Sequence, residues 1–184
     1  MRHPVYSIGS PVLSEGSVPV SATCIRAAKR SFATRRIDRD LAAGLITGVA
    51  APRAGDLVLA RIGMLGQHRK IGCTDGRRAT LWPGDEALLV DGDRYAPDQC
   101  EACVPADLAP CAMVAAGGVA AQVLPQSGKM RGATAIVPLG LVTDAAGRRL
   151  STCDFGINEA VCVARGPALL GSSMNAGKTT TMAR

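Results

Sequence analysis

The chain has 184 residues, of which 47% are hydrophobic, 20% are charged and only 3% are aromatic. This composition excludes an intrinsically disordered chain and predicts a globular fold whose core consists of Val, Leu, Ile and Ala. No stretch approaches the roughly 18 consecutive apolar residues of a membrane helix, and the N-terminus lacks the apolar segment of a secretory signal. We therefore expect a cytoplasmic protein with no membrane partner.

Positive charge is concentrated in the first part of the chain. Residues 1–70 carry eleven Lys and Arg against four Asp and Glu, which accounts for more than the whole net charge of +6. Six basic residues are close together in the sequence: Arg26, Lys29, Arg30, Arg35, Arg36 and Arg39. Such a cluster can neutralise nucleic-acid phosphates, but the scarcity of aromatic residues that stack on bases favours a solvated protein surface.

The chain contains an odd number of cysteines, seven, which argues against a full disulfide framework. Cys100, Cys103 and Cys111 form the one local cluster. Two thiolates at C-x2-C spacing can hold one side of a zinc ion, but a structural site needs four ligands, and neither His3 nor His68 has metal-ligand spacing. We expect the thiols to be small buried hydrophobic groups, with zinc or a redox pair as the less favoured alternative.

The predicted elements begin with a basic N-terminal segment, residues 1–43, in which residues 21–32 are a candidate helix. Residues 44–157 are predicted to form a β-rich domain. Short apolar runs at 44–51, 57–65, 70–73 and 79–82 alternate with turn signals, one of which is TDGRR, where Gly76 can adopt positive φ. The similar phrases GDLVLARIG and GDEALLVDG are interpreted as ordinary turn and strand chemistry rather than a repeat.

Further strands are predicted at 117–124, 133–142 and 151–155, with a hairpin-like turn at 143–150. The stretch 104–116 is a candidate for a helical turn or two, limited by Pro105 and Pro110, with Asp107 helping to open the turn. Several short strands at such spacing predict a mainly β fold, a small β-barrel or sandwich-like domain.

The sequence changes character after residue 155, and residues 158–184 are predicted to be a separate unit. The apolar stretch VCVARGPALL is followed by a Gly/Ser/Asn loop and then by GKTTTMA, which can begin a helix. This first β-loop-α piece has the order that a phosphate-binding loop requires, because such a loop directs backbone N–H groups inward and ends at the positive end of a helix dipole. Gly177 would allow close backbone approach, Lys178 would contact the β- and γ-phosphates, and Thr179 would bind Mg²⁺.

The loop GSSMNAGKT, with its G-x5-G-K-T spacing, resembles the GT-x4-GKT loops of dethiobiotin synthetase and its relatives among the P-loop NTPases. The resemblance covers roughly the last fifteen to twenty residues and implies ATP with Mg²⁺ as the ligand. The nucleotide-contacting residues that it implies are Gly171, Asn175, Ala176, Gly177, Lys178, Thr179 and Thr180. The β-rich region resembles no family through any residue-level motif.

Two functional hypotheses follow from the sequence. In the first, these residues are the N-terminal portion of an ATP-binding P-loop NTPase, and the 184-residue chain alone does not hydrolyse ATP, because a carboxylate strand and further β-α units would have to come from a missing C-terminal domain or a second chain. In the second, the β domain is a nucleic-acid-binding or protein-interaction module. Its candidate nucleic-acid contacts are Arg30, Arg35 and Arg36 of the basic cluster.

Overall fold

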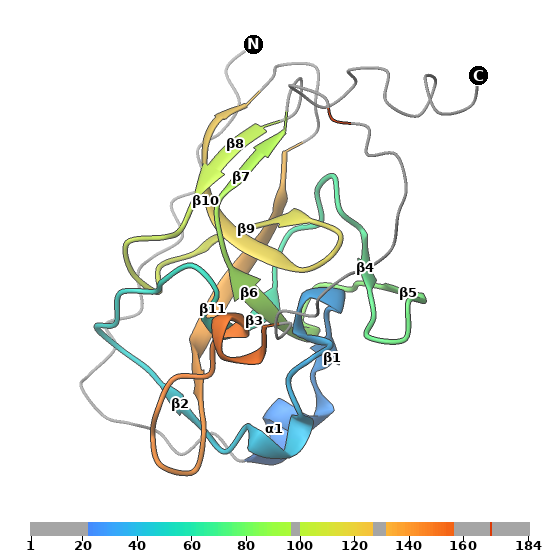
Figure 1. The fold of residues 1–184 in the computed structure, drawn as a ribbon. Helices are drawn as coiled ribbons and strands as arrows, with labels where there is room; N and C mark the ends of the chain where they lie inside the picture. The colour runs from blue at the N-terminus through green and yellow to red at the C-terminus, as the bar shows by residue number, and fades with distance from the viewer. Residues whose placement is uncertain (1–21, 97–99, 127–131, 157–169, 171–184) are drawn as a thin grey trace.

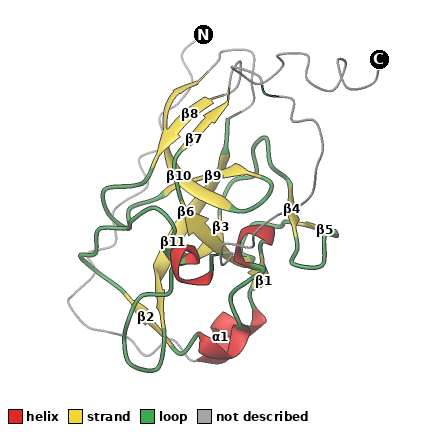
Figure 2. Cartoon of the chain, viewed as in Figure 1, coloured by secondary structure: helices red, strands yellow, loops and turns green. Residues whose placement is uncertain are grey.

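The computed structural model describes residues 22–96, 100–126, 132–156 and 170. Strands make up 45% of these residues and helices 11%, so the mainly β class predicted from the sequence is confirmed. Five strands close into a small barrel, and the helical segments are short and lie outside it (Figure 1, Figure 2).

The barrel consists of β3 (Leu57–Ile62), β6 (Glu86–Asp91), β9 (Cys111–Ala115), β10 (Val119–Gln126) and β11 (Thr134–Thr143). Neighbours around the wall are β6, β3, β11, β9 and β10, all paired antiparallel. The parallel pairing of β10 with β6 closes the ring. Because the ring is closed, each of these five strands is paired with a neighbour on both sides over at least part of its length.

Six shorter strands extend this framework. They are β1 (Lys29–Arg30), β2 (Gly44–Ile46), β4 (Lys70–Gly72), β5 (Arg78–Thr80), β7 (Arg94–Ala96) and β8 (Cys100–Cys103). β4 and β5 form a separate antiparallel hairpin, whereas β7 and β8 extend the second half of β10 into an arm beyond the barrel (Figure 1). The helical elements are α1 (Ala22–Ala27) and three 3-10 turns, η1 (Phe32–Thr34), η2 (Arg39–Leu41) and η3 (Thr152–Phe155).

Strands β3 and β6 are buried on both faces, which explains their nearly continuous apolar sequences. Val58 and Ala60 belong to an inner core that receives side chains from all five barrel strands. Leu57 and Leu59, which alternate with them, belong to a second core outside the wall. The outer core also contains Ile25, so part of the predicted N-terminal segment, residues 22–43, packs against the barrel.

Matched turns precede β3 and β6, and the two strands pair antiparallel with each other. In each turn a glycine with positive φ, Gly55 or Gly84, comes directly before an aspartate, Asp56 or Asp85. Each carboxylate accepts a hydrogen bond from the backbone N–H three residues earlier. The donors are Arg53, at 3.0 Å, and Trp82, at 2.7 Å. The similar GD phrases therefore start two strands with the same local structure.

Most of the predicted strands are observed, and Gly76 has the expected positive φ, +82°, in the turn between β4 and β5. The candidate helix at 21–32 is shorter than predicted, because α1 ends at Ala27 and Lys29–Arg30 pairs with β6. None of the helices in the described ranges is long and apolar enough to cross a membrane.

Two other sequence predictions are wrong. The second half of 104–116 is strand β9 rather than helix, because Met113 and Val114 are buried between β10 and β11, whose backbones satisfy the hydrogen bonds of β9. Asp107 does stabilise a turn ahead of it, accepting a hydrogen bond from the Ala109 N–H at 2.9 Å. The predicted strand at 151–155 is the 3-10 turn η3. Ser151 Oγ caps this turn by accepting a hydrogen bond from the Cys153 N–H at 3.3 Å.

Candidate functional site

The predicted nucleotide-binding residues lie outside the described residues. They are Gly171, Asn175, Ala176, Gly177, Lys178, Thr179 and Thr180. The candidate sites among the described residues therefore belong to the barrel domain. They are the basic cluster, the β4–β5 hairpin, a pocket and a buried carboxyl group.

Part of the basic cluster has a structural role. The Arg30 guanidinium donates to the backbone carbonyls of Thr34, at 2.8 Å, and Ile37, and so it ties η1 to the segment that follows it. Burial, together with the charge of Arg39, lowers the pKa of Arg30. Lys29 pairs with the carboxylate of Asp85 and donates to the Thr80 carbonyl at 2.8 Å. The two side chains hold β1 to its surroundings.

Arg35 and Arg36 are both exposed to solvent, in contrast to Arg30. The Arg35 guanidinium lies over the ring of Phe32, 4.1 Å from its centroid, and also donates to the Phe32 carbonyl at 3.2 Å. Phe32 itself is 41% exposed. Arg30, Arg35 and Arg36 are the predicted nucleic-acid contacts. Arg35 is the one of them that is both accessible to solvent and held against an aromatic ring in the described structure.

The outer face of the β4–β5 hairpin carries a basic and aromatic surface that sequence reasoning missed. Lys70 pairs with Thr80, and Gly72 pairs with Arg78, so these side-chain positions lie on one face. The opposite face bears Ile71, which is fully buried in the barrel core. The Leu81 N–H donates to the Arg69 carbonyl at 3.0 Å, which continues the pairing by one residue.

The alternation of side chains continues past the end of β5. Leu81 is fully buried, whereas Trp82 is 64% exposed. Phe32 lies at the other end of the hairpin, because a Cβ added at Gly72 would be 3.7 Å from the Phe32 Cβ, and an isolated bridge joins Ser31 to Cys73. We call this surface the hairpin face. Its residues are Phe32, Arg35, Lys70, Arg78, Thr80 and Trp82. Residues 78–82, R-A-T-L-W, carry a sequence signal for the hairpin face, because the first, third and fifth of them are exposed.

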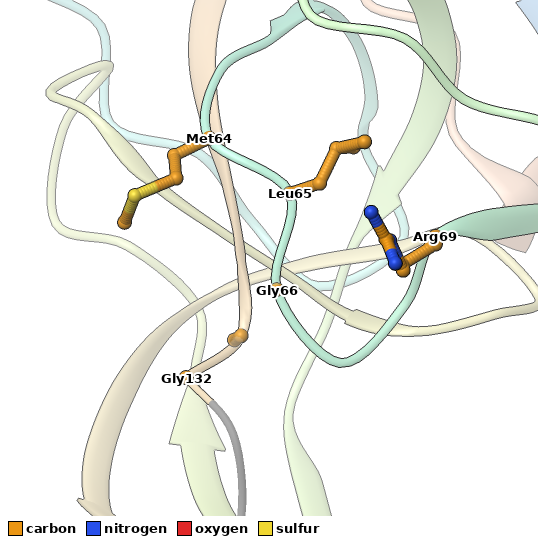
Figure 3. A pocket seen from close by; sticks show the side chains of 6 residues that line it. Met64, Leu65, Gly66, Arg69 and Gly132 are labelled. Atoms are coloured by element: carbon orange, nitrogen blue, oxygen red, sulfur yellow. The ribbon is translucent and has the colours of Figure 1, made fainter.

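A pocket of about 370 Å³ opens beside the loop that follows β3. Its lining consists of Met64, Leu65, Gly66, Arg69, Gly132 and Ala133. Figure 3 shows Leu65 and Arg69 on one side of the loop and the Met64 side chain on the other. A Cβ at Gly66 would lie 2.0 Å from the Gly132 carbonyl oxygen, so the two backbones approach too closely for any other residue. Among the described residues that line the pocket, Arg69 is the one charged side chain, and no pair of groups is suited to acid-base or nucleophilic chemistry.

His68, which lies in the same loop, has a structural environment. Its Nε2 is 3.0 Å from the Val114 carbonyl oxygen, and burial lowers its pKa, so the neutral ring donates this hydrogen bond. The Thr134 hydroxyl donates to the His68 carbonyl at 2.6 Å and accepts from the Gly66 N–H at 3.1 Å. These contacts fix the loop against the start of β11.

Asp91, at the end of β6, is a buried carboxyl group with an unusual environment. It is 2% exposed, and its Oδ2 atom has no hydrogen-bond partner among the residues that the structure describes. Burial and the charge of Asp56 raise the pKa of Asp91 to about 7. Asp56 differs in having a cation beside it, Arg149 Nη1 at 3.2 Å. Because Asp91 is inaccessible to a ligand, we assign it an effect on stability rather than catalysis.

The six described cysteines are free thiols, and the expectation that they are buried is wrong. Cys24 and Cys153 are exposed, and the others are partly exposed. Cys100 and Cys103 lie at the two ends of β8, a strand of the arm rather than of the barrel wall. Burial and the charge of Asp91 raise the pKa of Cys111 to about 12, which keeps this thiol protonated. Within the described ranges, no group of three His, Cys, Asp or Glu side chains is placed to hold a metal ion.

No protein-family model matches this chain, and no curated protein or solved structure matches it.

Proposed function

We propose that this chain binds a nucleoside triphosphate with Mg²⁺ through residues 171–180, and that the β-barrel is an accessory domain of a P-loop NTPase. The observation that carries the proposal is the sequence order: an apolar stretch, PALL, then a loop of small residues, then GKTT. Phosphate loops need this order because the strand positions the loop and the loop delivers backbone N–H groups to the anion.

Each residue type at the end of the loop has a distinct task in the proposed complex. Gly177 lets the backbone approach the phosphates, and the Lys178 ammonium compensates the charge of the β- and γ-phosphates. The Thr179 hydroxyl would be a ligand for the Mg²⁺ that accompanies the nucleotide, and the metal would offset the negative charge of the phosphates. Hydrolysis also needs a carboxylate that orders the metal or the attacking water, which the proposal assigns to a further NTPase domain or a second chain.

The barrel contributes differently to the proposed function. Among the described residues, buried hydrophobic side chains from all five strands pack against one another inside the barrel, which leaves its outside as the surface for a ligand. A substrate or partner would therefore bind to the outside of the barrel, which is where exposed basic and aromatic residues are found.

The test is a titration of the full-length protein with a fluorescent ATP analogue in the presence of Mg²⁺. Lys178→Ala removes a charge-assisted contact to the phosphates, so we expect roughly 10- to 100-fold weaker binding. Arg148→Ala is the matched control, because it removes a positive charge from a side chain that is 82% exposed and lies outside both proposed binding surfaces. Equal ATP affinity of Lys178→Ala and the unaltered protein would show that residues 171–180 are not the nucleotide site.

A further inference from the structure

The hairpin face combines positive charge with accessible aromatic rings, which is uncommon in a chain with 3% aromatic residues. The hairpin and its flanks, residues 69–82, carry four basic residues and one acidic residue. That acidic residue, Asp75, lies 3.9 Å from Arg77, and the nearby Asp85 is paired with Lys29. Positive charge therefore predominates on this side of the molecule.

The two aromatic residues are exposed in different ways. Trp82 is 64% exposed, so most of its indole ring is accessible from solvent. Phe32 is covered on one face by the Arg35 guanidinium, whose outer plane is itself a surface on which a flat ring can stack. The two stacking positions lie at opposite ends of the hairpin, with Lys70 and Arg78 on the strands between them.

We propose that the hairpin face binds single-stranded nucleic acid, with bases stacked on Trp82 and on the Arg35–Phe32 pair and with phosphates beside Lys70 and Arg78. Stacking requires unpaired bases, so the surface selects single strands over duplexes. An acidic protein would satisfy the charges equally well but would leave Trp82 without a specific partner. This inference is independent of nucleotide binding at residues 171–180.

Trp82 is the single tryptophan of the chain, so intrinsic fluorescence reports on the proposed surface directly. Adding an unlabelled single-stranded DNA or RNA of about 20 nucleotides should quench this fluorescence, because stacked bases contact the indole. Both nucleic acids are expected to bind, since phosphates and base faces are common to them. A fluorescence signal that does not change at saturating oligonucleotide would overturn the proposed stacking.

Anisotropy of a labelled oligonucleotide separates the contributions of charge and stacking. Affinity for nucleic acid falls as salt rises, and Lys70→Ala and Arg78→Ala should each make this dependence weaker. The slope of log affinity against log salt, measured between about 50 and about 200 mM salt, should decrease in magnitude by about one for each variant. Arg148→Ala is the charge-matched control, because Arg148 is 82% exposed on another turn. It should weaken binding less than Lys70→Ala or Arg78→Ala does.

Trp82→Ala should weaken binding roughly tenfold, and Trp82→Phe should retain most of the affinity, because an aromatic ring remains for stacking. Tyr95→Ala is the aromatic control, since Tyr95 is 75% exposed on β7, in the arm. The proposal is overturned if a duplex of equal length binds as tightly as the single strand, or if polyglutamate competes as well as unlabelled DNA. The latter result would identify the surface as a site for acidic proteins.

Discussion

Individual charged residues in this chain differ in function according to what surrounds them. Lys29 and Arg30 belong to the same basic cluster of the sequence as Arg35 and Arg36, yet their side chains bind carbonyl and carboxylate groups of the protein. Arg35 remains accessible and lies on an aromatic ring. The sequence shows that basic residues cluster here, but it cannot tell which of them are exposed and which are engaged by the protein. Only the fold brings the carbonyl groups and the carboxylate close to Arg30 and Lys29.

The buried carboxyl group of Asp91 makes the stability of the fold depend on pH. Its pKa is raised from 3.8 to about 7 by burial and by Asp56, so the folded protein holds a proton that the unfolded chain has released between these pH values. Stability from this group is therefore fully present below about pH 4 and is lost as the pH rises to about 7. At about 1.4 kcal/mol per pKa unit, the loss is at most about 4 kcal/mol.

The variant Asp91→Asn removes this titration while keeping the shape of the side chain. We expect it to raise the free energy of unfolding at pH 8 and to change it much less near pH 4, as measured by urea denaturation across the range. Asp144→Asn is the control with the opposite sign, because hydrogen bonds from backbone and side-chain groups of Arg148 lower the pKa of Asp144. An Asp91→Asn variant whose stability parallels the unaltered protein at every pH would contradict the assignment.

Elements of the fold follow from the sequence where turn chemistry and burial agree. The GD turns, the Gly76 turn and the apolar strands β3 and β6 are all visible in the sequence. Strand β9 is not, because Ala and Met are good helix formers and only pairing with β10 and β11 makes this segment a strand. Tertiary pairing overrides local propensity in this segment.

Close packing at the turn between β9 and β10 should make the stability of the fold sensitive to a substitution of Gly118. Gly118 has φ of +95°, and an added Cβ would lie 2.0 Å from the Ser31 Cβ. Gly118→Ala should therefore destabilise the fold by about 3 kcal/mol or more, through both backbone strain and displacement of the segment that carries β1. Thermal or urea unfolding measures this change.

The neighbouring Gly117→Ala variant is the control, because an added Cβ at Gly117 has no atom within 4 Å and the residue does not have positive φ. Its unfolding free energy should change by no more than about 0.5 kcal/mol. Equal losses for the two variants would mean that the close packing of Ser31 against Gly118 does not hold this part of the fold.

At the scale of the whole molecule, the chain joins a closed barrel to a candidate phosphate loop. The barrel class could be predicted from strand spacing alone, because short apolar runs and turns are local features. Closure through the parallel pairing of β6 with β10 could not, since it joins residues about thirty positions apart. The hairpin face was missed for the same reason: Phe32 and Trp82 become parts of one surface only through the packing of η1 beside β4.

We propose that nucleotide binds at residues 171–180 and not at the basic surface of the barrel. Hydrogen exchange of the full-length protein with and without MgATP tests it most directly, because bound phosphates engage the backbone N–H groups of the loop. We expect slower exchange in peptides that cover residues 171–181 and unchanged exchange in the hairpin, residues 69–82. Protection of the hairpin with no change at residues 171–181 would contradict it.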